Sequence, residues 1–236
     1  MNPSDMAKRA AADAAVALVE TGMVVGLGSG STLAHVVAAL GRRVREEGLR
    51  IIGIPTSTET EALALTSGIT LAELDDTPID LAIDGADEVE TGTLRLIKGL
   101  GAALLREKIV VQASRRFVVV ADASKIVVTL GARAPLPVEV VRFGHGATAR
   151  RLTELGGMPV LRLDPSCLPR LTDGGNVIYD CPGFAPIRDP FTLQRQLRAI
   201  VGVVESGLFL DCAEQAIIGA ADGSISVMRP LRPQGE

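Results

Sequence analysis

The sequence is short of the residues that build disulfide frameworks and metal sites. It contains three cysteines and two histidines in 236 residues. Cys167, Cys181 and Cys212 are odd in number and show neither CxxC nor His-rich spacing, so we expect no disulfide framework and no metal site. Cysteines that form neither a disulfide nor a metal site are typical of a reducing compartment, which predicts a cytoplasmic protein. His35 and His145 have no visible acidic or nucleophilic partners, and we assign neither a catalytic role.

Long apolar runs and an excess of positive charge are also missing. The alanine-rich stretch from Ser4 to Glu20 is interrupted by charged side chains, so neither a signal peptide nor a membrane span is expected. The formal net charge of -4 argues against a broad nucleic-acid surface, which needs clustered Lys and Arg. The sequence therefore predicts no nucleic-acid and no membrane partner, although a few amides and cations would suffice for a small anion.

Apolar residues are plentiful and alternate between strand and helix patterns. They make up 47% of the chain, enough to bury a substantial core. After the first helical stretch, the patterns predict strands at Met23–Leu27, Arg50–Ile54, Ile79–Ile83 and Phe117–Ala121, with helices at Leu33–Glu47, Thr58–Ser67 and Ala102–Gln112. This alternation indicates an α/β protein with a Rossmann-like parallel sheet and helices on both faces.

The pattern changes after Lys125, where prolines separate shorter segments. We expect strands at Val138–Val141, Pro159–Leu163 and Asn176–Tyr179, and helices near Ala147–Leu155 and Phe191–Ile200. The sequence thus predicts a small α+β domain at 132–206 and a Rossmann-like catalytic domain at 1–131 and 207–236. Asp222-Gly223, between two apolar segments, is typical of a hairpin turn, and we expect this hairpin to return to the main sheet.

The first group of residues that could carry chemistry is the run GLGSGST, from Gly26 to Thr32, between a strand and a helix. Glycines can turn backbone amides towards a ligand, and hydroxyls at a helix N-terminus suit a phosphate. A dinucleotide fingerprint would have glycine in place of Ser31, and a P-loop would have Gly-Lys-Ser or Gly-Lys-Thr. The run therefore favours a monophosphate, with a plain tight turn as the alternative.

Two carboxylates follow the strand at 79–83. Asp84 ends the strand and Asp87 comes after Gly85 and Ala86, so both could project into the crevice at the carboxyl end of a parallel sheet. They could accept sugar hydroxyl bonds or move protons. Magnesium ligation and a capping or turn role are the alternatives.

A third group is formed by Lys98 and the helix that follows it. Glu107 has Ala103, Leu104, Val110 and Val111 as helical neighbours, which predicts that its carboxyl lies at least partly against apolar surface. Desolvation would raise the pKa of Glu107 towards neutrality, as a general base needs. A surface salt bridge is the alternative.

Lys125 follows the strand at 117–121. A lysine at this end of a strand can reach the same crevice and offset phosphate or enediolate charge. A merely solvated lysine is the alternative.

These four groups together resemble the motif set of the ribose-5-phosphate isomerases of type A, and the resemblance extends to Leu136–Val140, Leu155–Gly157 and Thr172–Asn176. It implies a cofactor-free isomerase of the non-oxidative pentose phosphate pathway, with a smaller ferredoxin-like domain, assembled as a homodimer or homotetramer. The expected catalytic residues are Glu107 as the base, with Asp84, Asp87 and Lys98. The expected substrate-binding residues are Ser29, Gly30, Ser31, Thr32, Asp84, Gly85, Ala86, Asp87, Lys98, Gly99, Leu100, Gly101 and Lys125.

The chain departs from the family pattern at two positions. Ser29 stands where the family commonly has threonine, and it keeps the hydroxyl. The family commonly has three glycines where this chain has Gly99-Leu100-Gly101. Leu100 makes the backbone contact expected there an open question. Lys8 also matches a lysine sometimes implicated in substrate binding.

The mechanism that the resemblance suggests interconverts ribose 5-phosphate and ribulose 5-phosphate. Asp84 would help to open the furanose, and Glu107 would move a proton from C2 to C1. Lys98, Lys125 and nearby amides would stabilise the enediolate. Ser31 and Thr32 would hold the phosphate, and Asp87 would orient a hydroxyl or share in ring opening. Two rival readings are an amino-sugar phosphate deaminase and a sugar-phosphate-sensing regulator; for the latter, we see no room for a helix-turn-helix.

Overall fold

The computed structural model describes residues 2–75 and 78–231. Its main sheet has seven strands in the order β15-β14-β7-β4-β1-β2-β3, all parallel to their neighbours except the edge strand β15. The strands of this sheet are β1 (Val24–Leu27), β2 (Ile52–Pro55), β3 (Thr70–Leu71), β4 (Leu81–Gly85), β7 (Phe117–Asp122), β14 (Gln215–Gly219) and β15 (Ile225–Met228). The predicted parallel sheet and the return of the last hairpin to it are confirmed.

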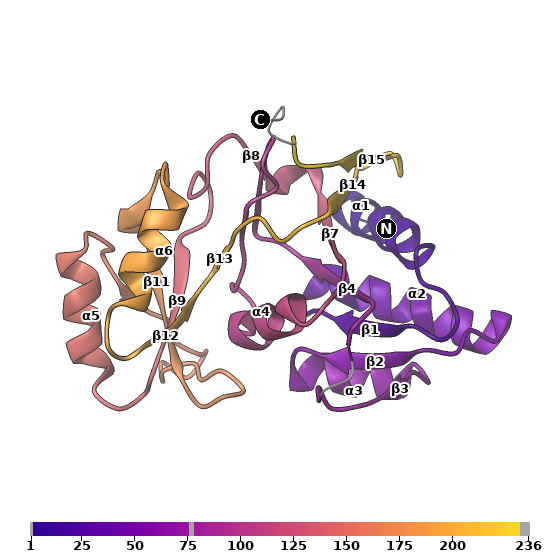
Figure 1. The fold of residues 1–236 in the computed structure, drawn as a ribbon, viewed down its shortest axis with the longest axis horizontal. Coiled ribbons are helices and arrows are strands. Elements are labelled where there is room, and N and C mark those ends of the chain that lie inside the picture. The colour runs from indigo at the N-terminus through magenta and orange to yellow at the C-terminus, as the bar shows by residue number, and fades with distance from the viewer. Residues whose placement is uncertain (1, 76–77, 232–236) are drawn as a thin grey trace.

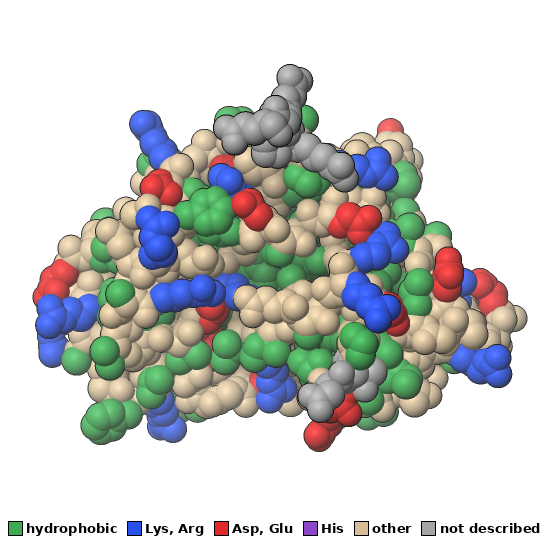
Figure 2. Space-filling view, viewed as in Figure 1, with side chains coloured by type: hydrophobic (Ala, Val, Ile, Leu, Met, Phe, Trp, Pro, Cys, Tyr) green, Lys and Arg blue, Asp and Glu red, His purple; other side chains and the backbone are tan. Residues whose placement is uncertain are grey.

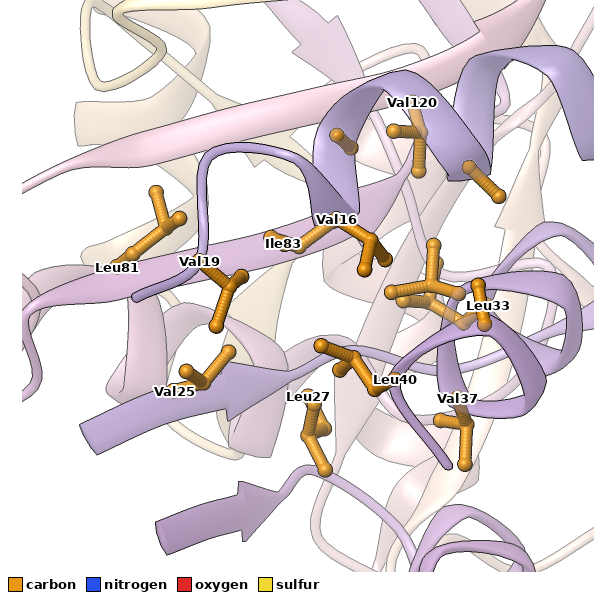
Figure 3. Packing of buried hydrophobic residues seen from close by; sticks show 14 of the residues in the cluster. Val16, Val19, Val25, Leu27, Leu33, Val37, Leu40, Leu81, Ile83 and Val120 are labelled. Atoms are coloured by element: carbon orange, nitrogen blue, oxygen red, sulfur yellow. The ribbon is translucent and has the colours of Figure 1, made fainter. Parts of the chain in front are cut away.

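Helices cover both faces of the main sheet (Figure 1). On one face, α1 (Pro3–Val16), α2 (Ser31–Glu47) and α3 (Thr58–Thr66) bury their apolar sides. The close view in Figure 3 shows Val16 of α1 and Leu33, Val37 and Leu40 of α2 around side chains of β1 and β4. On the other face, Val110 and Val111 of α4 (Leu104–Gln112) pack against the sheet. Alternate residues of each strand serve the two faces because side chains alternate along a strand.

A second sheet forms the smaller half of the molecule, at the left of Figure 1. Its chain order is β9 (Leu136–Val140), α5 (His145–Glu154), β10 (Val160–Leu161), β11 (Val177–Cys181), α6 (Pro190–Arg198) and β12 (Val203–Ser206). The strands pair antiparallel in the order β10-β11-β9-β12. This βαββαβ arrangement is ferredoxin-like. All its elements lie within 132–206, while the exact domain division stays a prediction.

A third sheet was not predicted from the sequence. It has the order β13-β6-β5-β8, and its strands are β5 (Glu88–Glu90), β6 (Leu96–Ile97), β8 (Ile126–Val127) and β13 (Leu208–Phe209). Leu96 and Phe209 join the core of the main sheet, whereas Ile97 and Leu208 join the core of the small sheet. The apolar side chains of β6 and β13 therefore connect the cores of the two halves. Lys98 is the residue that follows β6.

Other differences from the sequence prediction are at element ends. The strand expected at Val138–Val141 begins at Leu136 and includes Pro137, whose missing N–H is tolerated near the start of a strand. The strand expected at Pro159–Leu163 is reduced to Val160–Leu161. The short strands β3, β5, β6, β8, β12 and β13 were missed because two to four residues carry too little periodicity to be recognised.

The surface agrees with the mixed charge of the sequence. On the face drawn in Figure 2, the Lys and Arg side chains are interspersed with Asp and Glu. Within residues 2–75 and 78–231, no helix combines the length and the apolar character needed to cross a membrane.

Candidate active site

A cavity of about 270 Å³ lies at the carboxyl ends of β1, β4 and β7. In the main sheet, β2 and β3 lie on one side of β1 and β4 on the other, so the strand order reverses here, as is typical of ligand sites in open α/β sheets. The cavity is lined by Ser4, Lys8, Ser29, Gly30, Ser31, Thr32, Gly85, Ala86, Asp87, Lys98, Gly99, Gly101, Glu107, Asp122, Ser124 and Lys125.

A buried lysine between two carboxylates forms the floor of the cavity. The Lys98 ammonium lies 2.9 Å from Asp84 Oδ2 and 3.2 Å from Glu107 Oε2, and it donates to the carbonyl oxygen of Gly85 over 2.8 Å. The side chains of Lys98, Asp84 and Glu107 are 4%, 2% and 5% exposed. The buried surroundings predicted for Glu107 are thus confirmed, and one buried ammonium group contacts both carboxyl groups.

The electrostatics of this group favour proton uptake by Glu107. Burial, with the negative charges of Asp84 and Asp87, raises the pKa of Glu107 to about 8 against the opposing effect of Lys98. Burial also raises the pKa of Asp84, although Lys98 and the N–H groups of Gly85 and Ser29 oppose that shift. Because Asp84 has these two backbone donors in addition to the lysine, we assign the more readily exchanged proton to Glu107. Burial acts against the Lys98 ammonium, but the two carboxylates outweigh it and raise the pKa of Lys98.

Asp84 does not line the cavity itself but lies behind Lys98, which does. Asp84 Oδ1 accepts the N–H of Gly85 at 2.7 Å and of Ser29 at 3.2 Å. The chain passes so close at Gly28 that a Cβ there would meet Asp84 Cγ at 2.0 Å. The second glycine of the GLGSGST run is therefore needed for packing against Asp84.

The opposite end of the cavity has groups that suit an anion. Gly30 is the N-cap of α2 and supplies no side-chain cap, which leaves the first N–H groups of the helix for a ligand. Lys8 of α1 reaches this end and donates to Ser31 Oγ over 2.9 Å. Lys125, in the turn after β7, lines the same cavity. A phosphate fits this combination of amides, hydroxyls and two ammonium groups.

Ser29 anchors the loop through its side chain. Its hydroxyl donates to Ser57 Oγ over 2.7 Å and lies 2.8 Å from Thr56 Oγ1. These bonds tie the loop after β1 to the start of α3. Ser29 lines the cavity as predicted, but its hydroxyl is engaged with the protein.

The loop at 99–101 closes the remaining wall. The Leu100 N–H donates to Asp87 Oδ2 over 2.9 Å. Leu100 has no positive φ, so its backbone can take this conformation with a side chain, which is 40% exposed. The Leu100 N–H is thus bonded to Asp87, and the backbone contact with the substrate expected at this position stays a prediction. Gly99, with φ +110°, does need the freedom of glycine.

The fold brings together all the predicted site residues except two. Asp84 lies below the cavity, and Leu100 takes part through its backbone and is absent from the lining. The sequence prediction missed Ser4, Asp122 and Ser124, which also line it. Asp122 Oδ1 accepts the Ser124 N–H at 2.9 Å. The Asp-x-Ser spacing at a strand end was a usable signal for this turn, whereas nothing local marks Ser4.

The contacts of Asp84 and Asp87 give little support to the alternative interpretation that they bind magnesium. The cation beside Asp84 is Lys98, and Asp87 accepts a backbone N–H. Within 2–75 and 78–231, no cluster of three or more His, Cys, Asp or Glu side chains could hold a metal ion.

Comparison with known proteins points to one family. The family model of ribose 5-phosphate isomerase A (phosphoriboisomerase A) matches residues 52–223. Ribose-5-phosphate isomerase A of Synechococcus sp. (strain JA-3-3Ab) is 52% identical over 224 residues, which cover 94% of this chain and 97% of the relative. That of Gluconobacter oxydans (strain 621H) is 52% identical over 218 residues, with coverages of 92% and 94%.

Solved structures agree with the sequence relatives. Ribose 5-phosphate isomerase A from Methanocaldococcus jannaschii superposes with a TM-score of 0.91 at 42% identity, covering 97% of this chain and 100% of that one. A D-ribose-5-phosphate isomerase in complex with phospho-erythronic acid gives a TM-score of 0.91 at 38% identity, with the same coverages. The α/β fold with its smaller second unit is confirmed by these neighbours.

Proposed function

The chain belongs to the ribose 5-phosphate isomerase A family, and from this membership we propose the chemistry of its cavity. The protein is an aldose-ketose isomerase that interconverts D-ribose 5-phosphate and D-ribulose 5-phosphate through an enediolate. One observation carries the assignment of roles: a buried carboxylate of raised pKa, Glu107, lies beside a buried ammonium, Lys98, at one end of a cavity whose other end suits a phosphate.

Glu107 is the proposed base. Its carboxylate takes the proton from C2 of the open-chain aldose, the electron pair forms the C1–C2 double bond, and the aldehyde oxygen gains the negative charge. The protonated Glu107 then returns the proton to C1, and transfer of the O2 proton to O1 leaves a carbonyl at C2 and a hydroxyl at C1, which is the ketose. The Lys98 ammonium, fixed before the reaction starts, stabilises the negative oxygen at the moment when it forms. No hydride carrier is needed because the oxidation pattern only shifts between two carbons.

The phosphate would be held by the N-terminus of α2 with Ser31, Thr32, Lys8 and Lys125. Its binding energy fixes the sugar so that C1 and C2 lie beside Glu107. The solved relative with phospho-erythronic acid supports a phosphorylated, anionic sugar derivative as the ligand class. The proposed site is thus divided into an anchoring end and a reacting end.

The geometry supports Asp87 over Asp84 for ring opening. Asp87 lines the cavity and uses one carboxylate oxygen for Leu100, which leaves the other for a sugar hydroxyl. Asp84 is buried below Lys98 and holds that ammonium in place. We therefore propose that Asp84 acts on Lys98, whereas Asp87 contacts the sugar.

The function is tested by a direct assay of the purified protein with ribose 5-phosphate and excess EDTA. We expect ketose formation at an undiminished rate, with exchange of solvent deuterium into the sugar. Release of ammonia from an amino-sugar phosphate would instead identify a deaminase. Binding of ribose 5-phosphate without turnover or exchange would identify a sensing protein.

The raised pKa of Glu107 predicts the pH dependence of the reaction. A base must be unprotonated, so kcat/KM should fall as the pH decreases through the pKa of Glu107, about 8. We expect the ascending limb of the profile near pH 8. The second ionisation of the substrate phosphate lies near pH 6 and can be measured separately by titration. An ascending limb that lies wholly below pH 6 would contradict the proposed environment of Glu107.

Assembly and location complete the proposal. Family membership supports a homodimer or homotetramer, and Phe143 and Val201, which are 93% and 94% exposed, are candidate contact residues on the small half. Light scattering of the purified protein decides between the assemblies. The cytoplasmic location is supported by the free cysteines Cys167, Cys181 and Cys212, and it stays a prediction.

A further inference from the structure

Arg162 links the small sheet to the cavity. It directly follows β10, and its guanidinium forms a two-pronged ion pair with Asp180 of β11, with Nε 2.9 Å from Asp180 Oδ2 and Nη2 on Oδ1. The remaining nitrogen, Nη1, donates to the carbonyl oxygens of Gly99 over 2.8 Å and of Leu100 over 3.1 Å. The Arg162 side chain is only 11% exposed. Most of the side chain is therefore buried where the small sheet meets the 99–101 loop.

These two carbonyl contacts determine where the loop's amides point. In a trans peptide the C=O and the N–H of one unit point in opposite directions. When Arg162 holds the Gly99 oxygen, the Leu100 N–H is turned to the other side, where it donates to Asp87 over 2.9 Å. The next unit obeys the same rule, so holding the Leu100 oxygen turns the Gly101 N–H away from Arg162, and Gly101 itself lines the cavity.

The loop needs an external support of this kind. Gly99 and Ala102 both have positive φ values, +110° and +68°, and for alanine this conformation is unfavourable. The Gly99 oxygen accepts the Ala102 N–H at 3.0 Å within the loop, but that bond does not fix the loop relative to Asp87. A planar guanidinium held by Asp180 can fix it, because its donors have fixed directions.

We infer that Arg162, oriented by Asp180, is a positioning residue for the isomerisation: it sets the peptide units of the 99–101 loop so that Asp87 and the loop amides face the sugar. The inference rests on the proposed function of the cavity. It also explains how Leu100 is accommodated, since what the site uses at this position is a backbone N–H. The small half of the protein thereby contributes to catalysis through residues that do not touch the substrate.

The test compares kcat, KM and the inhibition constant of inorganic phosphate in the wild type, Arg162→Met and Arg162→Lys. We expect kcat of Arg162→Met to fall by about 10- to 100-fold, as small misplacements at a reacting centre do. The phosphate inhibition constant should stay within about twofold, because the α2 end of the cavity is untouched. Arg162→Lys keeps the charge but cannot serve Asp180 and two carbonyls together, so its kcat should also fall.

A matched control separates positioning from loss of stability. Leu152 is fully buried in the core of the small sheet, and Leu152→Ala should lower the unfolding temperature by the usual cavity effect while retaining kcat below that temperature. The inference is overturned if both Arg162 variants keep kcat within about twofold of the wild type, or if Leu152→Ala loses as much kcat as Arg162→Met. A wild type without isomerase activity would instead refute the proposed function.

Discussion

Replacing Glu107 by Gln is expected to lower kcat by about 10³-fold, within the range that general acid-base catalysis contributes. Glutamine keeps the shape of the side chain and can still contact Lys98, which lies 3.2 Å from Glu107 Oε2. It cannot accept a proton from carbon. Exchange of solvent deuterium into the sugar should fall in parallel with kcat, because both require the same proton transfer.

The same substitution should leave the protein as stable as before or more stable. The folded state raises the pKa of Glu107 from 4.5 to about 8, so the wild type loses stability as the pH rises through this window. The Glu107→Gln variant has no carboxyl group to ionise at this position, so it does not lose this stability as the pH rises. Its unfolding temperature should therefore exceed that of the wild type more clearly at pH 9 than at pH 6.

Glu139→Gln provides a matched control. Glu139 is also a buried carboxylate, 1% exposed, but it accepts from Thr172 and Asn176 away from the substrate cavity. This variant should keep kcat within a few-fold at temperatures where it is folded. Near-normal turnover of Glu107→Gln would remove Glu107 from the role of base.

Replacing Lys98 by Met is expected to affect both activity and stability. Loss of a preorganised positive group beside the developing oxyanion should lower kcat by about 10²- to 10³-fold. It also leaves Asp84 and Glu107 buried without their shared cation. Removing one partner of a buried ion pair costs about 3–5 kcal/mol of stability.

The stability loss of Lys98→Met should depend on pH with a definite sign. Burial already raises the pKa values of both carboxylates, and the loss of Lys98 raises them further. A carboxyl with a raised pKa contributes stability that is lost as the pH rises through its folded-state pKa. Thermal unfolding should therefore show a smaller deficit at pH 5.5 than at pH 8.5.

Two further variants separate these effects. Lys108 is a second buried lysine, paired with Glu205 at 2.9 Å and placed over the same Phe209 ring as Lys98. Lys108→Met should lower stability but keep kcat within several-fold. The double variant Lys98→Met/Glu107→Gln should regain stability relative to Lys98→Met and stay inactive. If Lys98→Met retains wild-type kcat, the ammonium is not the stabiliser of the enediolate.

The sequence by itself determined the α/β alternation and the chemistry at the strand ends. Strand and helix periods are local, so they can be recognised without knowing the partners of each element. The burial of Glu107 was predictable for the same reason, because its helical neighbours three and four residues away are apolar. The loop proposed to hold the phosphate was equally local, because Ser29–Thr32 are consecutive residues at one helix N-terminus, whereas Lys8 and Lys125 come to it from other parts of the chain.

Only the tertiary structure decided how these groups are combined. That Lys98 serves both Asp84 and Glu107, that Asp84 lies beneath the cavity, and that Arg162 holds the 99–101 loop all depend on strand order and on packing between the two halves. Such contacts join residues far apart in the chain and leave no periodic pattern in it. The third sheet escaped prediction because its strands of two or three residues are specified by their partners.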